Sequence, residues 1–235
     1  MTDVTQVAAR AIREMRDYQA GLRRDPTHAH VLLGDLRHAL IPTHVLARDL
    51  PAEVESLVGR PACFAVTSRI GRVIGQAHAK AFFAYSGGAA EGWDFRVLSG
   101  PMYFAWTGFG DVDLLLWEID SAEDFAILWE SDNSFSATEA LQQGDRGRSC
   151  HMQAGYAAGW CEVATGMQLE TREIACRAEG VSHCRFLVAP AKDFEERILG
   201  PRFHRPTSSY SIMRFKSDSF SDEQIAAAPP RSPTA

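Results

Sequence analysis

Three cysteines and one glutamate in the second half of the chain are spaced like the ligands of a zinc ion. Cys176 and Cys184 flank a short segment that contains Gly180, while Glu173 lies just before the first cysteine and Cys150 lies farther upstream. Structural zinc sites hold four such side chains in a tetrahedron, often a close pair plus ligands from elsewhere in the chain. Isolated cysteines are also found as unconnected core residues, so the spacing alone leaves both interpretations open.

The other two of the five cysteines are expected to be buried thiols. Cys161 lies eleven residues after Cys150 on one expected helix. That spacing is a rise of about 16 Å, which is too long for two ligands of one ion. Cys63 lies in an apolar segment and is expected in the core. His151 and His183 stand beside candidate cysteines and are alternative ligands, but the thiolates are better donors and both imidazoles are expected to face solvent.

A site with four protein ligands is closed, so it would stabilise the fold and leave no open position to activate water. Three thiolates and a carboxylate around a divalent cation carry an excess of negative charge. Arg172, Arg177 and Arg185 lie near these ligands in the sequence and are expected to offset that charge.

The composition predicts a packed globular chain that neither binds nucleic acid directly nor spans a membrane. Of the 235 residues 46% are apolar, the formal net charge is −6, and the longest Lys/Arg run is the pair Arg23-Arg24. Such a chain offers no basic face to a phosphate backbone. Its apolar runs fall far short of the roughly 20 residues that cross a bilayer. The N-terminus has no apolar stretch of signal-peptide type, which predicts a cytoplasmic location and reduced cysteines.

The N-terminal third is expected to be mainly helical. Apolar residues recur every three or four positions over residues 4–22, which predicts an amphipathic helix whose stripe packs in the core or forms a dimer seam. A short strand is expected at 31–33, a helical stretch at 37–50 closed by Pro51, and another at 53–57. A further helix is predicted over residues 71–85, ended by the glycine pair that follows it.

The middle of the chain reads as an antiparallel meander. After Gly100-Pro101, short runs rich in aromatic and β-branched residues predict strands at 102–106, 112–119 and 125–129. Glycine and aspartate residues between the runs are typical of turns.

The last third combines one helix with a hairpin. Residues 149–164 are expected to form a helix whose small side chains allow close approach of a neighbouring backbone, and residues 168–176 and 183–188 are expected to pair as antiparallel strands. A short helix follows Pro190, and the Pro- and Ser-rich tail from Pro201 is expected to be disordered.

The predicted fold class is therefore α+β, with an antiparallel sheet packed against helices, a zinc-bound β-hairpin and an N-terminal helical dimerisation region. Three parts are expected: residues 1–85 as the N-terminal helical dimerisation region, 86–200 as the domain that binds ligand and zinc, and 201–235 as the tail.

Residues from about Gly100 to Phe194 resemble the effector-sensing domain of phenol- and xylene-responsive bacterial transcription activators, including its four-vinyl-reductase (hydrocarbon-binding) module. The residues that carry the resemblance are Gly100-Pro101, Ile127-Leu128-Trp129, Gly155-Tyr156-Ala157-Ala158-Gly159-Trp160, Arg172-Glu173, Cys176 and His183-Cys184-Arg185. The resemblance implies that zinc is bound by Cys150, Glu173, Cys176 and Cys184. It also implies a buried pocket for an aromatic effector, a homodimer and no catalysis.

The chain departs from that family in two ways. It has no Gly-x-x-x-x-Gly-Lys loop of the family's ATPase module, so any output is expected to pass through a partner protein or a missing segment. The phenol sensors carry a histidine that hydrogen-bonds the effector hydroxyl, and Phe104 stands at the matching position, whereas Trp129 matches the accompanying tryptophan. A hydroxyl without a buried partner binds poorly, which disfavours phenol itself.

The resemblance leads us to expect six residues around a hydrophobic aromatic ligand: Phe104, Ile127, Trp129, Tyr156, Trp160 and Thr171. Tyr103 and Trp106 are possible neighbours, although residues 103 and 104 would face opposite sides of the expected strand. The alternative is that these aromatic residues simply fill the core.

Two other functions are alternatives to a sensor. An enzyme or assembly factor related to vinyl reduction in tetrapyrrole synthesis would need an electron donor, and the sequence has no Gly-x-Gly-x-x-Gly fingerprint and no cysteines left for an iron–sulfur cluster. A scaffold resembling vesicle-tethering subunits would need an exposed apolar groove.

Overall fold

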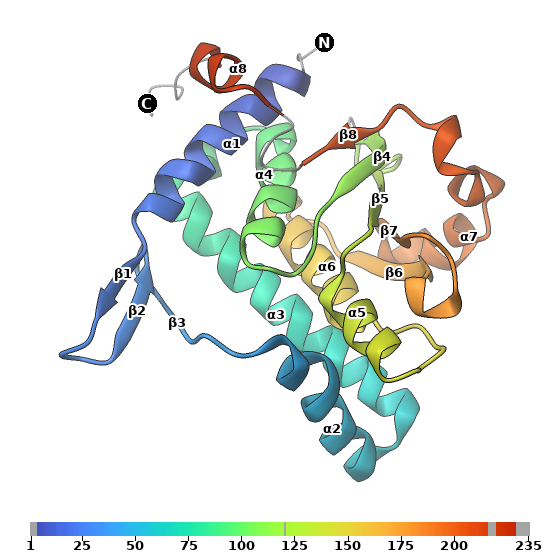
Figure 1. The fold of residues 1–235 in the computed structure, drawn as a ribbon. Helices are drawn as coiled ribbons and strands as arrows, with labels where there is room; N and C mark the ends of the chain where they lie inside the picture. Colours follow the sequence, from blue (N-terminus) through green and yellow to red (C-terminus); the bar gives the residue numbers. More distant parts are fainter. Residues whose placement is uncertain (1–3, 120, 216–219, 229–235) are drawn as a thin grey trace.

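A five-stranded antiparallel sheet forms the centre of the computed structural model, which describes residues 4–119, 121–215 and 220–228 (Figure 1). The strand order is β6-β7-β5-β4-β8. The strands are β4 (Asp113–Glu118), β5 (Ala126–Ser131), β6 (Leu169–Ala175), β7 (Cys184–Pro190) and β8 (Met213–Arg214). Every residue of β5 is buried, because both faces of the sheet are covered.

Helices cover one face of the sheet, and the α+β class with antiparallel sheets against helices is confirmed. The helices are α1 (Val4–Ala20), α2 (Leu50–Val58), α3 (Arg60–Ser86), α4 (Trp93–Trp106), α5 (Phe135–Gln142), α6 (His151–Thr165), α7 (Phe194–Ile198) and α8 (Asp222–Ala227). The main core joins side chains of α1, α3, α4 and α6 with the sheet residues that face them.

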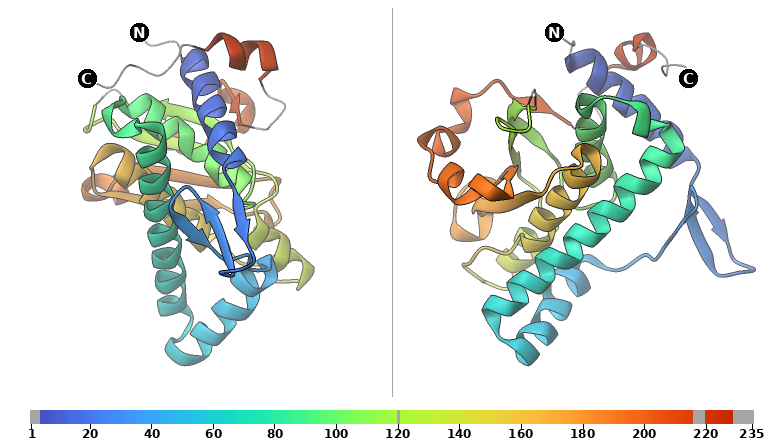
Figure 2. Two further views of the ribbon diagram at one scale, coloured as in Figure 1. Left: turned by 90° about the vertical axis from the view of Figure 1, so that its left-hand side faces the viewer. Right: turned by 180° about the vertical axis from the view of Figure 1, so that it is seen from behind.

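Glycines let α3 and α6 cross with their backbones in contact. Gly71 and Gly75 of α3 face the backbone of α6, and Gly155 and Gly159 of α6 face the backbone of α3. A Cβ added at Gly155 would lie 1.8 Å from the Ser68 carbonyl oxygen. No side chain fits in that space, so the four glycines fix the distance between the two helices. Figure 1 and the view from behind in Figure 2 show the two helices side by side.

The N-terminal helix packs within the same chain. Ala8, Ile12, Met15 and Tyr18 belong to the main core, and α1 lies against α4. The stripe predicted from the sequence therefore serves the core. After α1 the chain forms a small antiparallel sheet that stands away from the rest of the molecule (Figures 1 and 2). Its strands are β1 (Arg23–Asp25), β2 (His30–Leu33) and β3 (Leu36–His38), of which the sequence had indicated β2 alone.

The expected strand at residues 102–106 is wrong, because these residues form the last turns of α4. Pro101 lies inside this helix, and Gly100 lies so close to α6 that a Cβ would be 2.8 Å from the Trp160 ring. Packing of the helix against α6 therefore outweighs the strand preference of the aromatic residues. The Gly-Pro pair therefore does not end an element. It lies within α4, where Gly100 contacts the Trp160 ring.

Pro51 lies at the beginning of a helix, whereas the sequence suggested that it closes one. Residues 37–50 are not one helix: they contain β3 and a π-helical turn, Val45–Asp49. Pro51 lies in the first turn of α2, and Pro61 lies in the first turn of α3, which starts well before the expected residue 71. The first turn of a helix tolerates proline because its N–H groups have no helical acceptor.

The described residues 201–215 and 220–228, which the sequence assigns to the tail, contain short helical turns, the strand β8 and the helix α8. Phe203, in a 3₁₀ turn at Pro201–His204, packs with Phe194 and Ile198 of α7 against Leu128 and Leu187 on the second face of the sheet. The tail thereby covers apolar strand residues that would otherwise face solvent. Residues 216–219 and 229–235 lie outside the described part.

Within the described residues, none of the helices is both long and apolar enough to cross a lipid bilayer.

Candidate functional site

The four residues predicted to bind zinc lie together in the structure. The ligand atoms of Cys150, Glu173, Cys176 and Cys184 all lie within 4.8 Å of one another. Sγ of Cys184 is 3.5 Å from Sγ of Cys150 and 4.0 Å from Sγ of Cys176. The three cysteines are fully buried and Glu173 is 3% exposed. The sequence thus predicted the cluster, which joins residues up to 34 positions apart.

The cluster is assembled from a helix start and a hairpin. Cys150 is the N-terminal cap of α6, and Cys184 begins β7. Glu173 lies in β6 directly before a register irregularity between Glu173 and Ala175, and Cys176 follows the end of that strand. The irregularity turns the end of β6 so that residues 173 and 176 both face the first residue of β7.

The donors fit a tetrahedral zinc ion. With Zn–S bonds near 2.3 Å, two thiolates of a tetrahedral site lie about 3.8 Å apart, close to the two measured separations. Oε2 of Glu173 accepts the Cys150 N–H at 3.1 Å, whereas Oε1 is buried without a hydrogen-bond partner among the described residues. A metal ion would satisfy this atom, since an unpaired buried carboxylate oxygen is costly.

Electrostatics also favour a cation in this cluster. Burial raises the pKa of Glu173 to about 8, and burial raises the pKa of Cys150 well above its usual value. A divalent cation would replace the protons that these groups otherwise hold.

Two of the three arginines that were expected to balance the negative charge of the cluster pair with other carboxylates instead, so the expectation is wrong for these two. Arg172 forms an ion pair with Glu195, and Arg185 forms one with Glu130. Arg177 contributes its backbone N–H, which donates to Sγ of Cys184 at 3.4 Å. Backbone donors and the α6 N-terminus therefore face the sulfurs in place of charged side chains.

The two neighbouring histidines and the two other cysteines lie outside the cluster. The His151 ring stacks on Phe64 with 4.1 Å between ring centroids. The expectation that this ring faces solvent is therefore wrong. His183 is half-buried, and its Nδ1 lies 2.8 Å from the Ser182 hydroxyl. Cys63 and Cys161 are buried thiols, as predicted.

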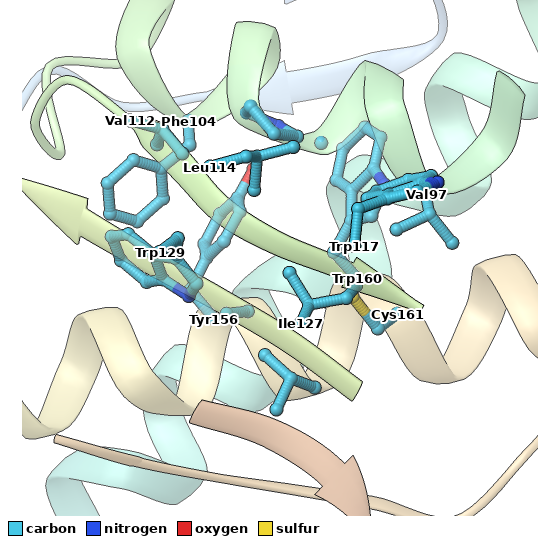
Figure 3. A pocket seen from close by; sticks show the side chains of 14 residues that line it. Val97, Phe104, Val112, Leu114, Trp117, Ile127, Trp129, Tyr156, Trp160 and Cys161 are labelled. Carbon is cyan, nitrogen blue, oxygen red and sulfur yellow. The ribbon is translucent and has the colours of Figure 1, made fainter. Parts of the chain in front are cut away.

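A separate apolar cavity of about 50 Å³ lies between α4, α6 and the sheet (Figure 3). Five of the six expected ligand-site residues line it: Phe104, Ile127, Trp129, Tyr156 and Trp160. Thr171 does not line it. This residue lies on β6, and its Oγ1 is buried with no hydrogen-bond partner in the described part of the chain. Tyr103 and Trp106 also lie outside the lining.

The helical geometry of α4 explains why Phe104 lines the cavity and Tyr103 does not. Successive residues of a helix are turned by about 100° about the helix axis, so the side chains of Tyr103 and Phe104 point in different directions but not to opposite sides. Phe104 packs against Trp129 with ring centroids 5.5 Å apart, while Tyr103 packs against His78 at 4.7 Å. Phe104 therefore lines the cavity although the expected strand was wrong, and its role in ligand binding stays a prediction.

The polar ends of the lining side chains are bonded outside the cavity. The Tyr156 hydroxyl lies 3.1 Å from Nδ1 of His78, which is buried. Nε1 of Trp160 donates to the Arg96 carbonyl oxygen at 2.8 Å. Burial lowers the pKa of His78 to about 4, so this imidazole is neutral near pH 7. The cavity wall therefore consists almost wholly of carbon.

The sequence analysis missed part of the lining. The additional residues are Val97, Gly100, Pro101, Val112, Leu114, Trp117, Ala157, Cys161 and Val188. Val97, Gly100 and Pro101 lie on α4, and their place in the lining could not be predicted because the sequence did not indicate this helix. Val112, Leu114 and Trp117 lie in a correctly predicted strand, but their pattern does not separate a cavity wall from a filled core.

Comparisons with known proteins agree with the predicted family. Residues 135–190 match the family model of the V4R domain. The phenol-responsive sensory domain of the transcription activator PoxR, solved with phenol, is similar with a TM-score of 0.68 and 23% identity, over 82% of this chain and 96% of that chain. Subunit 3 of a trafficking protein particle complex from Naegleria fowleri, covalently bound to palmitic acid, gives a TM-score of 0.46 and 16% identity, over 63% of this chain and 94% of that one. No curated protein matches the sequence significantly.

The matched segment contains all four residues of the Cys/Glu cluster and the part of the cavity wall that α6 and β7 provide. Residues 135–190 thus match the V4R domain, and the fold of the chain is similar to that of the PoxR sensory domain.

Proposed function

We propose that this protein is a non-catalytic sensor that binds a small aromatic hydrocarbon in the apolar cavity. The observation that carries the proposal is a wall of aromatic and aliphatic side chains whose polar atoms are bonded elsewhere, as for Tyr156 and Trp160. Binding sites for small molecules are mostly apolar concave spaces with few polar groups. The structural neighbour PoxR supports sensing of a small molecule, because its sensory domain was solved with phenol.

The ligand that we propose differs from phenol. Phe104 lies 5.5 Å from Trp129 and 5.3 Å from Tyr156, measured between ring centroids, and offers no donor or acceptor to a hydroxyl. Burying a hydroxyl without a partner costs about 1–3 kcal/mol, which amounts to a loss of affinity of roughly 5- to 150-fold. An unsubstituted or alkyl-substituted benzene carries no such penalty.

Thermal unfolding with added ligand tests this proposal. Toluene or a xylene is expected to raise the melting temperature, since a ligand at a hundredfold excess over its Kd adds about 2.7 kcal/mol to stability. Phenol at equal concentration is expected to have a much smaller effect. Equal and negligible shifts with all these compounds would contradict the sensor function.

We also propose that Cys150, Glu173, Cys176 and Cys184 bind one structural zinc ion. The support is the tetrahedral spacing of the sulfurs and the unpartnered Oε1 of Glu173. Four protein ligands close the site, so the ion would stabilise the hairpin and take no part in a reaction. A cytoplasmic location accompanies this proposal, because thiolate ligands require a reducing compartment.

We further propose that the chain acts as a homodimer and signals through a partner protein or another segment. Leu40, after β3, is 79% exposed and Leu57, on α2, is 81% exposed, and exposed apolar side chains such as these support contact with a second copy of the chain. Residues 1–85 would then provide the dimer contacts and residues 86–200 the ligand and zinc sites. Native mass spectrometry tests the dimer, and a monomer at micromolar concentration would contradict it.

A further inference from the structure

The cavity has one side where its wall reaches the surface. Of the lining residues, Pro101, Trp117 and Ala157 are half-buried, and all the others are buried. Trp117 is the largest of the three. Figure 3 shows it at the same end of the cavity as Val97 and Trp160, away from the end where Phe104 and Trp129 lie. The surface end of the cavity is therefore closed mainly by one indole ring.

The cavity is too small for an aromatic ligand as it stands. Its volume is about 50 Å³, whereas a cavity of roughly 150 Å³ is known to accommodate benzene. A close-packed interior does not stretch evenly, so a side chain must move to make room. Pro101 is fixed by its ring and Ala157 is small, which leaves Trp117 as the lining residue at the mouth that can both open and enlarge the space.

Trp117 is also the least restrained aromatic residue of the wall. Trp129 stacks on Phe186 with 4.0 Å between centroids, and Nε1 of Trp160 is hydrogen-bonded to Arg96. Over the described residues, Trp117 has neither a ring partner nor a side-chain hydrogen bond. Its packing against the core is apolar and partial, so turning it outward breaks few specific contacts.

The strand that carries Trp117 is weakly supported on its outer side. β8 pairs with Asp113 and Leu114 of β4, and no described strand continues this pairing to Trp117. The pairing of β4 with β5 also shifts register between Leu114 and Leu116, directly before this residue. A strand edge that follows a bulge moves more easily than a paired central strand.

We propose that Trp117 is the gate and the size-determining residue of the cavity, and that its indole moves outward to admit an aromatic hydrocarbon. This inference rests on the proposed function, because it concerns how the same cavity takes its ligand. Binding that requires such a change is slower than binding to an open site.

Replacing Trp117 tests the gate directly. Stopped-flow fluorescence measures toluene association in the wild type, Trp117→Ala and Trp117→Phe, and thermal shifts measure acceptance of naphthalene. We expect Trp117→Ala to bind toluene on the order of tenfold faster and to be stabilised by naphthalene, which the wild type excludes. Trp117→Phe should lie between the two. The control is Trp106→Ala, a tryptophan on α4 that does not line the cavity and should leave both properties unchanged.

The failure of the gate and of the proposed function are distinguishable. If the wild type binds toluene but both Trp117 variants match its association rate and still exclude naphthalene, the gate is wrong and the sensor function stands. If the wild type does not bind toluene at all, both are wrong. If Trp117→Ala fails to fold, Trp117→Phe tests the gate alone. A toluene association rate and a naphthalene response equal to those of the wild type would then overturn the gate.

Discussion

Phe104 lies where α4 faces both Trp129 and Tyr156, so its chemistry decides what the far end of the cavity can recognise. A phenyl ring there favours a ligand without polar groups. An imidazole at the same position would present a hydrogen-bonding nitrogen to the cavity. The choice between hydrocarbon and phenol is thus expected to depend on one side chain.

We expect Phe104→His to gain a response to phenol and to lose some affinity for toluene. One new hydrogen bond contributes about 1 kcal/mol, or roughly fivefold in the Kd of phenol. Isothermal titration with both compounds measures the change. Phe104→Leu is the control, because it alters the ring without adding a polar atom. A phenol affinity that is equal in the two variants would contradict this role of Phe104.

His78 makes the protein sensitive to acid. Its pKa is about 4 in the folded state because of burial, compared with 6.5 for an exposed histidine. Above pH 6.5 both the folded and the unfolded state are neutral at this residue, so it causes no pH dependence. Between pH 6.5 and 4 the unfolded state takes up a proton that the folded state does not, and the free energy of unfolding falls by about 1.4 kcal/mol per pH unit.

The variant His78→Gln, which cannot be protonated, is expected to lose the part of the pH dependence of the free energy of unfolding that His78 causes. Urea unfolding at pH 7, 6 and 5 measures the free energy of unfolding of both proteins, and carboxylates that titrate in the same range affect them equally. Parallel slopes for wild type and variant would show that His78 is not a buried neutral group.

At the scale of elements, the crossing of α3 and α6 positions both candidate sites, because Cys150, Tyr156 and Trp160 all belong to α6 or its cap. Gly155→Ala would place a methyl group 1.8 Å from the Ser68 carbonyl oxygen, so the helices would have to separate. We expect a loss of about 1–3 kcal/mol, or more if the helices cannot adjust.

For a chain of this size that loss lowers the melting temperature by about 2–4 °C for each kcal/mol. Gly147→Ala is the matched control, since an added Cβ there has no neighbour closer than 3.8 Å. Equal melting temperatures for the two variants would contradict the role of the glycine contact.

The sequence predicted the hairpin of β6 and β7 well, because a short apolar run and a turn that contains glycine are local signals. The Cys/Glu cluster could also be predicted, through spacing and family resemblance. The α4 helix could not, because Gly100 and Pro101 look like a break unless the Trp160 ring against which they pack is known. Val97, Gly100 and Pro101 of the cavity lining were missed for the same reason. Thr171 was placed by resemblance, and nothing local showed that it lies outside the lining.

At the scale of the whole molecule, the metal is expected to determine stability. A ligand that binds the folded state alone contributes about 4 kcal/mol when its free concentration exceeds Kd a thousandfold. We expect the purified protein to carry one zinc per chain and to lose about this much stability when a strong chelator removes it. Elemental analysis and urea unfolding measure the two quantities.

Cys184→Ser should abolish the bound zinc, and Cys63→Ser should keep it, because Cys63 lies outside the cluster and its Sγ donates to the Pro51 carbonyl oxygen. The apparent zinc affinity should fall as the pH is lowered, since the ion competes with protons on Cys150 and Glu173. Equal zinc content in the two variants would exclude the cluster as the metal site.

Helix α6 begins at Cys150 in the cluster and carries Tyr156 and Trp160 on the cavity wall. Binding of a metal at the cluster or of a ligand in the cavity is therefore expected to restrain the same helix. By reciprocity, if zinc tightens hydrocarbon binding by some factor, the hydrocarbon must tighten zinc binding by the same factor. If the proposed function holds, scarcity of zinc would then weaken the response of the protein to a hydrocarbon.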